Sequence, residues 1–214
     1  MSWIASARGP FEELLRAENH GGAGEVRRRL DGLRLAYRDL QLDGLDRPLA
    51  EGVQAARTRG VWVLWMLLRR LSSLRFEPIR QAWLQGQCEA TECLREASER
   101  IGGESLQSFF DFWVFGCGLP DVGLTHADCR SREGRHEVRL RLNNPGSAYT
   151  VPLVVQTQEG ARHELSLFVD AMTDAQLHLV TQPVSASVDP EYEVLMPSGD
   201  RPWLPVRARR FGWF

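Results

Sequence analysis

The spacing of the apolar residues changes once along this chain, and that change limits the folds it can adopt. Up to Phe115 they recur every three or four positions, which places them on one face of an α-helix. One such series is Leu30, Leu33, Tyr37 and Leu40. After Gly116–Pro120 they alternate, as in His136–Leu142, which is typical of a strand with one buried face. The sequence therefore predicts an α+β protein with a helical domain over residues 1–120 and a β-sandwich over residues 121–214.

Glycine and proline divide the first domain into about six predicted helices. They are expected near residues 10–20, 24–41, 55–71, 78–86, 93–101 and 105–114. Glycines 21, 22, 102 and 103 and the loop 44–52 mark breaks, because glycine readily adopts the backbone angles that end a helix. Pro78 is expected in a first helical turn, where its missing amide hydrogen has no partner to lose.

The second domain contains about seven short segments rich in strand-forming residues. They are residues 136–142, 149–156, 165–169, 177–180, 184–188, 192–196 and 203–207. Gln158–Gly160 is expected to be a hairpin turn between the second and third of these. Short strands at regular intervals predict an antiparallel sandwich.

Charge and hydropathy exclude several classes of protein. Among 214 residues, 26 basic and 28 acidic side chains give a net charge of −2, which argues against a nucleic-acid partner. The longest apolar run, Val61–Leu68, would rise only about 12 Å as a helix, against roughly 30 Å of hydrocarbon, so no membrane insertion is expected. The first residues lack the basic start and apolar middle of a secretory signal. A cytoplasmic location is expected for the chain as written.

The four cysteines, Cys88, Cys93, Cys117 and Cys129, do not form a C-x-x-C motif. In a domain of this size, scattered cysteines are most often free thiols that behave as small buried hydrophobes in a reducing compartment. That is the prediction here, although an even number leaves disulfides possible.

One segment begins like a zinc-peptidase motif. His163-Glu164 matches the start of H-E-x-x-H, but Leu167 replaces the second histidine. The segment alternates as a strand, in which positions four apart lie about 13 Å from each other and cannot chelate one ion. The match is therefore interpreted as chance.

Other candidate clusters also have structural interpretations. Asp121, Asp128 and Glu133 could form a carboxylate site near the domain junction, but solvated surface is the expected role. Five aromatic residues could form a base-stacking platform, but no arginine lies between them, and packing is expected instead. These are Phe109, Phe110, Phe112, Trp113 and Phe115.

Several stretches together resemble a known family. They are Arg59–Leu67, Arg75-Phe76, Ala90-Thr91, Leu94, Ala97-Ser98, Phe109–Val114 and Gly118–Pro120. As an ordered set they resemble the C-terminal half of the catalytic domain of gluzincin aminopeptidases, the family of membrane alanyl aminopeptidase and leukotriene hydrolase. That family reads K-G-x-x-V-L-x-M-L, R-F, A-T, A-S-G and F-F-x-x-W-V-x-x-x-G-x-P in this order.

The second domain extends the resemblance. Arg139–Leu142, Tyr149–Leu153, Val169-Asp170 and Ser187–Tyr192 are similar to the family's β-sandwich, which carries Y-x-x-P-L and a late V-D-P. The similarity covers about residues 55–210, and the helices that follow the family's zinc site would correspond to residues 11–50.

The departures from the family decide the expected activity. The family holds zinc with H-E-x-x-H and a later Glu, and binds the substrate amine with G-x-M-E-N, but none of these motifs occurs here. Its oxyanion-stabilising Tyr, three residues before the K-G glycine, is replaced by Arg57. Without the ligands, neither a zinc-activated water nor a polarised carbonyl is available. No cofactor and no catalytic residue are therefore expected in this chain.

The first hypothesis is a non-catalytic helical and β-sandwich portion of a zinc-aminopeptidase-like protein. Trp62, Trp65, Met66 and Trp113 would then form a packing face for a missing N-terminal half, with an exposed apolar patch or self-association that covers it. The alternative is a stand-alone protein–protein interaction module on a degenerate peptidase scaffold. A third hypothesis, a hydrolase with an unrecognised site, lacks any acid, base and nucleophile set.

Overall fold

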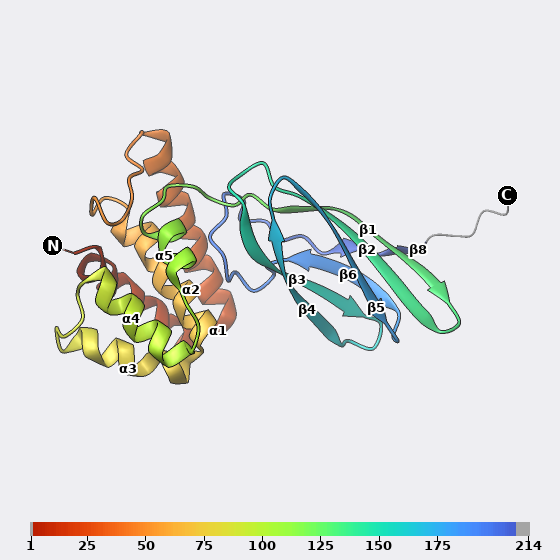
Figure 1. The fold of residues 1–214 in the computed structure, drawn as a ribbon, viewed down its shortest axis with the longest axis horizontal. Helices are drawn as coiled ribbons and strands as arrows, with labels where there is room; N and C mark the ends of the chain where they lie inside the picture. The colour runs from red at the N-terminus through yellow and green to blue at the C-terminus, as the bar shows by residue number, and fades with distance from the viewer. Residues whose placement is uncertain (1, 209–214) are drawn as a thin grey trace. The chain divides into compact units, whose positions relative to one another are not determined.

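Helices precede strands along the chain in the computed structural model, which describes residues 2–208 (Figure 1). The chain divides into two compact units, Met1–Gly118 and Leu119–Phe214. Within the described residues the first unit holds five α-helices and a π-helical segment, and the second holds two four-stranded sheets. The α+β class is confirmed.

The helical unit departs from the predicted six helices. Its elements are α1 (Trp3–Leu42), η1 (Ala56–Gly60), α2 (Val61–Leu71), α3 (Ser73–Leu84), α4 (Thr91–Gly102) and α5 (Gln107–Trp113). The predicted break at the first glycine pair is a kink inside α1, because Gly22 alone leaves the helical region, with φ 65°. The placement of Pro78 in a first turn is wrong, since α3 begins at Ser73 and carries this proline in its second turn.

The core of the helical unit is built around α2. Nine of its eleven residues are buried, and it packs against α1, η1, α3 and α4. Gly60, just before it, allows α1 to approach closely. A Cβ there would lie 3.2 Å from the Cβ of Ala7 and 3.3 Å from the ring of Trp3. A helix that is apolar on all sides is stable only when enclosed in this way.

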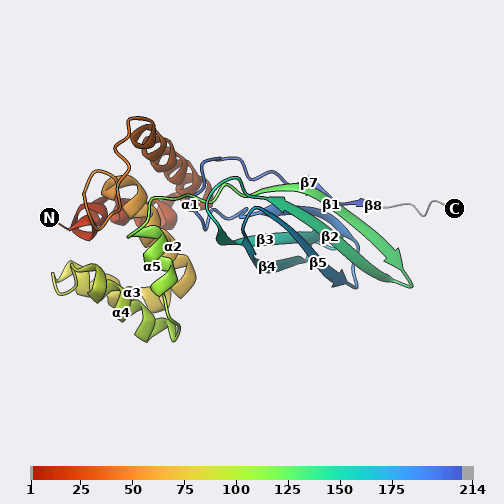
Figure 2. The ribbon, with the colours of Figure 1, turned by 45° about the horizontal axis from the view of Figure 1, so that its top comes forward.

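The second unit consists of two sheets, which Figure 2 shows as two layers. Its strands are β1 (Gly123–Arg132), β2 (Arg135–Asn143), β3 (Tyr149–Thr157), β4 (Arg162–Val169), β5 (Met172–Leu179), β6 (Pro183–Val188), β7 (Leu204–Pro205) and β8 (Arg207–Ala208). The sheet orders are β5-β2-β1-β8 and β4-β3-β6-β7, and all pairings are antiparallel except that of β1 with β8. Alternate residues of β2 and β3 face the core between the layers.

Five predicted strands correspond to β2–β6, and the turn at Gln158–Gly160 joins β3 to β4 as expected. The predicted strand at residues 192–196 is wrong, because this segment is a loop whose apolar side chains are buried without strand pairing. The predicted strand at 203–207 is divided into the two-residue strands β7 and β8. β1 was not predicted, and residues 209–214 of the expected second domain lie outside the described chain.

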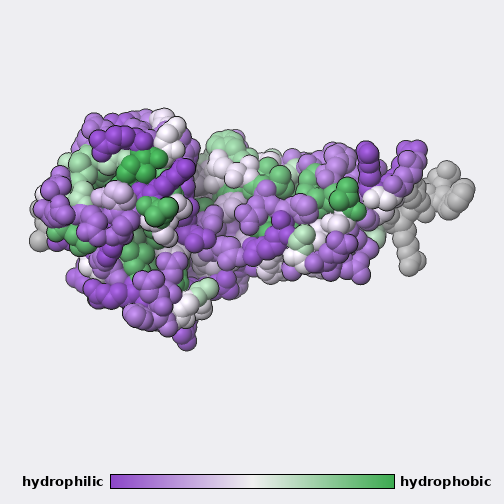
Figure 3. All heavy atoms as spheres, turned by 90° about the horizontal axis from the view of Figure 1, so that it is seen from below, coloured by the Kyte–Doolittle hydropathy of each residue, from purple (hydrophilic) through white to green (hydrophobic). Residues whose placement is uncertain are grey.

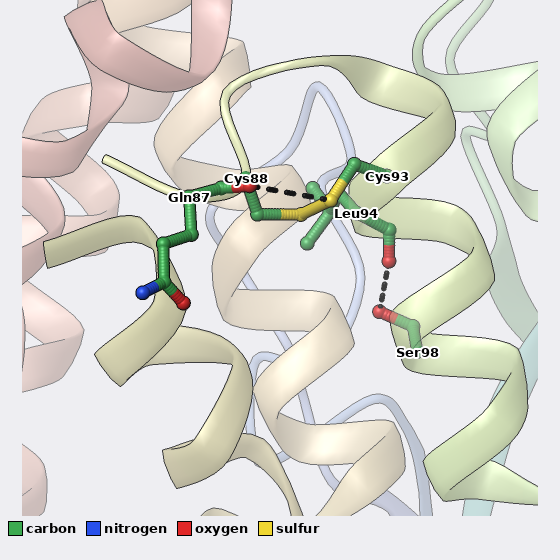
Figure 4. The surroundings of a disulfide bond; sticks show 5 residues. All are labelled: Gln87, Cys88, Cys93, Leu94 and Ser98. Carbon is green, nitrogen blue, oxygen red and sulfur yellow. Dashed lines mark hydrogen bonds between the residues drawn. A yellow bond between two sulfur atoms is a disulfide. The ribbon is translucent and has the colours of Figure 1, made fainter. Parts of the chain in front are cut away.

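The prediction of four free thiols is wrong. Cys88, in the loop before α4, forms a disulfide with Cys93 in the first turn of that helix (Figure 4). The turn of the chain into α4 brings their Cα atoms to 5.6 Å, within the span of a disulfide. Cys117 and Cys129 are free, the first exposed and the second buried. Only Cys129 is therefore the buried free thiol that the sequence predicted.

None of the described helices has the combination of length and hydrophobicity that a membrane crossing requires.

Candidate functional site

The segment that resembles the family's K-G motif contains two arginines with opposite environments. Arg57, which the resemblance would align with the family's Tyr, is exposed, whereas Arg59, which it would align with the Lys, is fully buried. Both lie in η1 two positions apart, so their side chains leave the helix on different sides. The residue expected at a catalytic position therefore faces solvent, and its neighbour lies in the core.

Arg59 connects four parts of the helical unit. Its Nη1 donates to the hydroxyl of Tyr37 at 3.0 Å, and its Nη2 donates to the carbonyl of Phe112 at 3.0 Å. Asp46 lies 3.7 Å from Nη1 and accepts from the Tyr37 hydroxyl at 2.8 Å. The guanidinium also lies over the ring of Trp113, 5.8 Å from its centre. Burial raises the pKa of Tyr37, so its hydroxyl stays protonated and remains a donor to Asp46.

Four residues were expected to form an exposed packing face, but the structure buries them. Trp62, Trp65, Met66 and Trp113 are all buried, the most exposed at 4%. α2 is enclosed by the helices around it, so these side chains already have partners within the chain. On the face shown in Figure 3, hydrophobic residues lie in small groups among hydrophilic ones. The burial of these four residues therefore contradicts the expectation that they form an exposed apolar patch.

Three of the five aromatic residues near α5 are core residues, as predicted. Phe109, Phe110 and Trp113 are buried, whereas Phe115 is 44% exposed. Phe112 packs edge-on against Trp113, with ring centres 4.9 Å apart. These contacts are typical of helix packing and leave no stacked row of open ring faces for bases.

The segment that resembles the family's V-D-P is organised by a second buried ion pair. Asp189 accepts from the backbone amides of Glu193 and Val194, at 2.6 and 3.1 Å, and lies 3.4 Å from Nε of Arg201. Arg201 lies over the ring of Tyr192, 5.1 Å from its centre. Burial raises the pKa of Asp189 from its ordinary value of 3.8 to about 7. These contacts hold the loop after β6 in place of the predicted strand.

A hollow of about 680 Å³ lies on the sheet β5-β2-β1-β8. Its lining includes Arg139 and Arg141, which alternate with buried residues of β2 and therefore point away from the core. His126 and Asp128 of β1 and Asp174 of β5 also line it. Three neighbouring strands thus place charged side chains around one concavity.

Asp128 positions His126 at this hollow. Nε2 of His126 lies 2.8 Å from Oδ2 of Asp128, whose side chain is 3% exposed, while that of His126 is 50% exposed. A buried carboxylate at this distance fixes the orientation of the imidazole. The hydroxyl of Thr125 donates instead to the carbonyl of Arg141, at 3.0 Å. The Thr125 hydroxyl is therefore engaged with β2.

The arginines of the hollow are paired with acids. Arg141 donates twice to Asp174, at 2.7 and 3.1 Å, and Arg139 donates to Glu137 at 2.6 Å. The surface therefore offers balanced charges rather than an open anion site. This balance suits a polar or zwitterionic ligand better than a phosphate.

A second group lies where β1 and β2 form a hairpin. Ser131 Oγ is 2.8 Å from Nδ1 of His136, and the Cys129 sulfur is 3.9 Å from each of these atoms. Burial raises the pKa of the Cys129 thiol, so it stays protonated rather than becoming a thiolate nucleophile.

The remaining predicted residues do not converge. His163 lies in β4, as the alternation predicted, and no group of three His, Cys, Asp or Glu residues that could hold a metal ion occurs within residues 2–208. Asp128 is buried rather than solvated, contrary to expectation, and Glu133 is exposed in the β1–β2 turn. The spacing H-x-D in a strand would have revealed the His126–Asp128 pair, but β1 itself was not predicted.

Neither a protein-family model nor a curated protein matches this sequence. The resemblance to gluzincin aminopeptidases therefore stays a proposal that depends on the residues quoted for it.

Proposed function

We propose that this chain is the helical and β-sandwich portion of a zinc-aminopeptidase-like protein and has no peptidase activity of its own. The observation that carries the proposal is the contact between two stretches of the resemblance, residues 59–67 and 109–114. Arg59 donates to the carbonyl of Phe112 and lies over the ring of Trp113, although about fifty positions separate them in sequence. Motif residues that serve one structural unit are expected to meet in this way.

The environment of Arg57 supports the absence of catalysis. An oxyanion stabiliser must present a fixed donor to a shielded site. Arg57 is exposed and permanently charged, whereas the family's Tyr is a neutral donor on a rigid ring. The sequence also lacks the zinc motifs, so the chain supplies neither a metal-activated water nor the group that would stabilise its product.

The experiment is metal analysis of the purified 214-residue chain, together with hydrolysis of aminoacyl anilides with and without a chelator. We expect substoichiometric zinc and no chelator-sensitive turnover. Arg57→Tyr tests this position directly. It restores the aromatic donor, but we expect no peptidase activity because the zinc ligands are still absent. Near-stoichiometric zinc with chelator-sensitive turnover would overturn the proposal.

The second candidate is a stand-alone protein–protein interaction module on a degenerate peptidase scaffold. The burial of Trp62, Trp65, Met66 and Trp113 favours it, since the helical core is closed without a further domain. This candidate predicts a single cooperative unfolding transition and little binding of a hydrophobic dye by the isolated chain. Strong dye binding and aggregation would instead support a portion that needs its missing half.

A further inference from the structure

The two edges of the sheet β4-β3-β6-β7 differ in protection. At one edge, β7 has two residues and contains Pro205, and both short length and proline are devices that block further pairing. At the other edge, β4 has eight residues, contains no proline, and pairs with β3 in an uninterrupted register. No strand of residues 2–208 lies beyond β4 (Figure 1). A long regular edge without these devices is a template for another strand.

The residues of β4 that face the sandwich strengthen this interpretation. Leu165 and Leu167 occupy the same face as the buried Val169, yet they are only partly buried. On the opposite face, Phe168 is 63% exposed. A strand added beside β4 would cover apolar surface on both faces, and this would add to the hydrogen bonds between the two backbones.

The ends of β4 carry opposite charges. Arg162 begins the strand, and Asp170 follows its last residue. In an antiparallel pair of identical strands centred on Ser166, each Arg162 lies opposite Asp170 of the other copy. The same register places Leu165 opposite Leu167 and keeps both leucines on the sandwich-facing side. One symmetric register therefore pairs the two end charges and the two leucines, and it places Glu164 opposite Phe168 on the outer face.

The same construction is poorer at β5, the long edge of the other sheet. Centred on Ala175, self-pairing of β5 places Asp174 opposite Gln176, without a charge partner. Asp174 is also engaged with Arg141 through two hydrogen bonds. Arg162 already donates to Glu191 at 2.7 Å, but its five N–H donors can also serve a second carboxylate.

We propose that β4 is a dimerisation strand and that its partner is β4 of a second copy, antiparallel and centred on Ser166. The two sheets would then become one continuous eight-stranded sheet across the two-fold axis. A closed two-fold interface of this kind uses the same surface on both copies and leaves no further edge at β4. The proposal is independent of the proposed lack of peptidase activity.

Cysteine cross-linking tests the register. In a Cys117→Ser background, which removes the exposed thiol, Ser166→Cys would place two cysteines across the axis with Cα atoms about 4.5–5.5 Å apart, within disulfide range. Glu164→Cys is the matched control, because its two copies would lie about 13 Å apart along the strand. We expect the oxidised dimer to form on non-reducing gels for position 166 and not for position 164. Equal cross-linking at both positions, or at neither, would overturn the proposal.

A charge exchange tests the same register without cysteines. Arg162→Glu and Asp170→Arg would each place like charges opposite each other, and each is expected to weaken the dimer about tenfold. The double variant restores opposite charges and should restore the affinity. Sedimentation of the wild-type chain up to about 200 µM provides the reference, since a single strand pair is a small interface. A wild-type monomer at all concentrations, or no recovery in a correctly folded double variant, would overturn the proposal.

Discussion

A buried arginine–aspartate pair occurs in each unit within residues 2–208, but the more deeply buried partner is the arginine in one unit and the aspartate in the other. In the helical unit the guanidinium of Arg59 is fully buried, and the side chain of Asp46 is 14% exposed. In the sandwich unit the carboxylate of Asp189 is fully buried, and the side chain of Arg201 is 5% exposed. Arg59 connects η1 to α1 and α5, whereas Arg201 and Asp189 hold the loop that follows β6.

This difference predicts which unit has a stability that depends on pH. Arginine keeps its charge at any ordinary pH, so the Arg59 contacts hold the helical unit independently of protons. A buried carboxylate can instead take up a proton, and burial raises the pKa of Asp189 to about 7. The helical unit is therefore expected to keep its stability across this pH range, whereas ionisation of the buried Asp189 is expected to destabilise the sandwich.

The largest effect is expected from removing the buried arginine. Arg59→Met should lower the free energy of unfolding by about 3–5 kcal/mol, because it leaves the Tyr37 hydroxyl and the Phe112 carbonyl without this donor and Asp46 without its ion-pair partner. Urea denaturation at pH 7 measures this change.

Arg57→Met, two residues away, is the matched control, and its exposed side chain should make the change smaller than about 0.5 kcal/mol. Similar losses of unfolding free energy for the two variants would show that the burial of Arg59 does not make it more important to stability than the exposed Arg57.

The second effect is a pH dependence in the sandwich. The folded pKa of Asp189, about 7, lies above its ordinary value of 3.8, so the folded state holds this proton more tightly than the unfolded state does. Its contribution to stability is complete below about pH 4 and is lost as the pH rises through 7, with a slope of up to about 1.4 kcal/mol per pH unit.

Asp189→Asn, which carries no titrating proton, should remove this slope. The free energies of unfolding of the wild type and the Asn variant are measured at about pH 4.5, 5.5, 6.5 and 7.5, and their difference is compared across this range. A constant difference across this range would show that Asp189 does not titrate there.

The disulfide gives a smaller effect, confined to the helical unit. Replacing Cys88 and Cys93 by serine should lower the free energy of unfolding by about 2 kcal/mol, because their bond closes a short loop in the unfolded chain. A reductant should lower the free energy of unfolding of the wild-type protein to that of the variant. Cys117→Ser is the control, and a loss as large as that of the double variant would show that the bond is not the cause.

The smallest effect is expected at the hollow of the sandwich. Asp174→Asn breaks an exposed ion pair with Arg141, so it should lower the free energy of unfolding only slightly, and added salt should reduce the loss further. A cost comparable to that of Arg59→Met would place this exposed pair among the groups that hold the fold. Thermal unfolding at low and high salt decides between these results.

The sequence predicted the fold best where one face of an element is buried. β2, β4 and β5 alternate clearly, β3 and β6 are rich in strand-forming residues, and the α2 region combines helical spacing with dense apolar content, so all were found. β1 was missed because a register shift between Leu124 and His126 disrupts its alternation, and because Thr125 is the one β-branched residue in its sequence. A bulge of this kind conceals a strand from any test of periodicity.

The candidate sites were less predictable because they depend on contacts between distant residues. Nothing in the spacing of Arg57 and Arg59 shows that one is exposed and the other buried; the packing of α1 and α5 decides it. The disulfide joins cysteines at a spacing that matches no motif, and only the turn into α4 brings them together. The side chains of α2 were identified as packing residues, but their partners could not be read from the chain.

The account's central claim is that the helical motif residues form a core closed within this chain. Hydrogen exchange of the purified protein tests it directly, because amide protection reports local opening. We predict that the amides of α2, from Trp65 to Leu71, exchange among the slowest of the helical unit and more slowly than those beside the Gly22 kink of α1. Exchange of α2 as fast as that of the kink would contradict the account and would mean that this core needs a partner to close it.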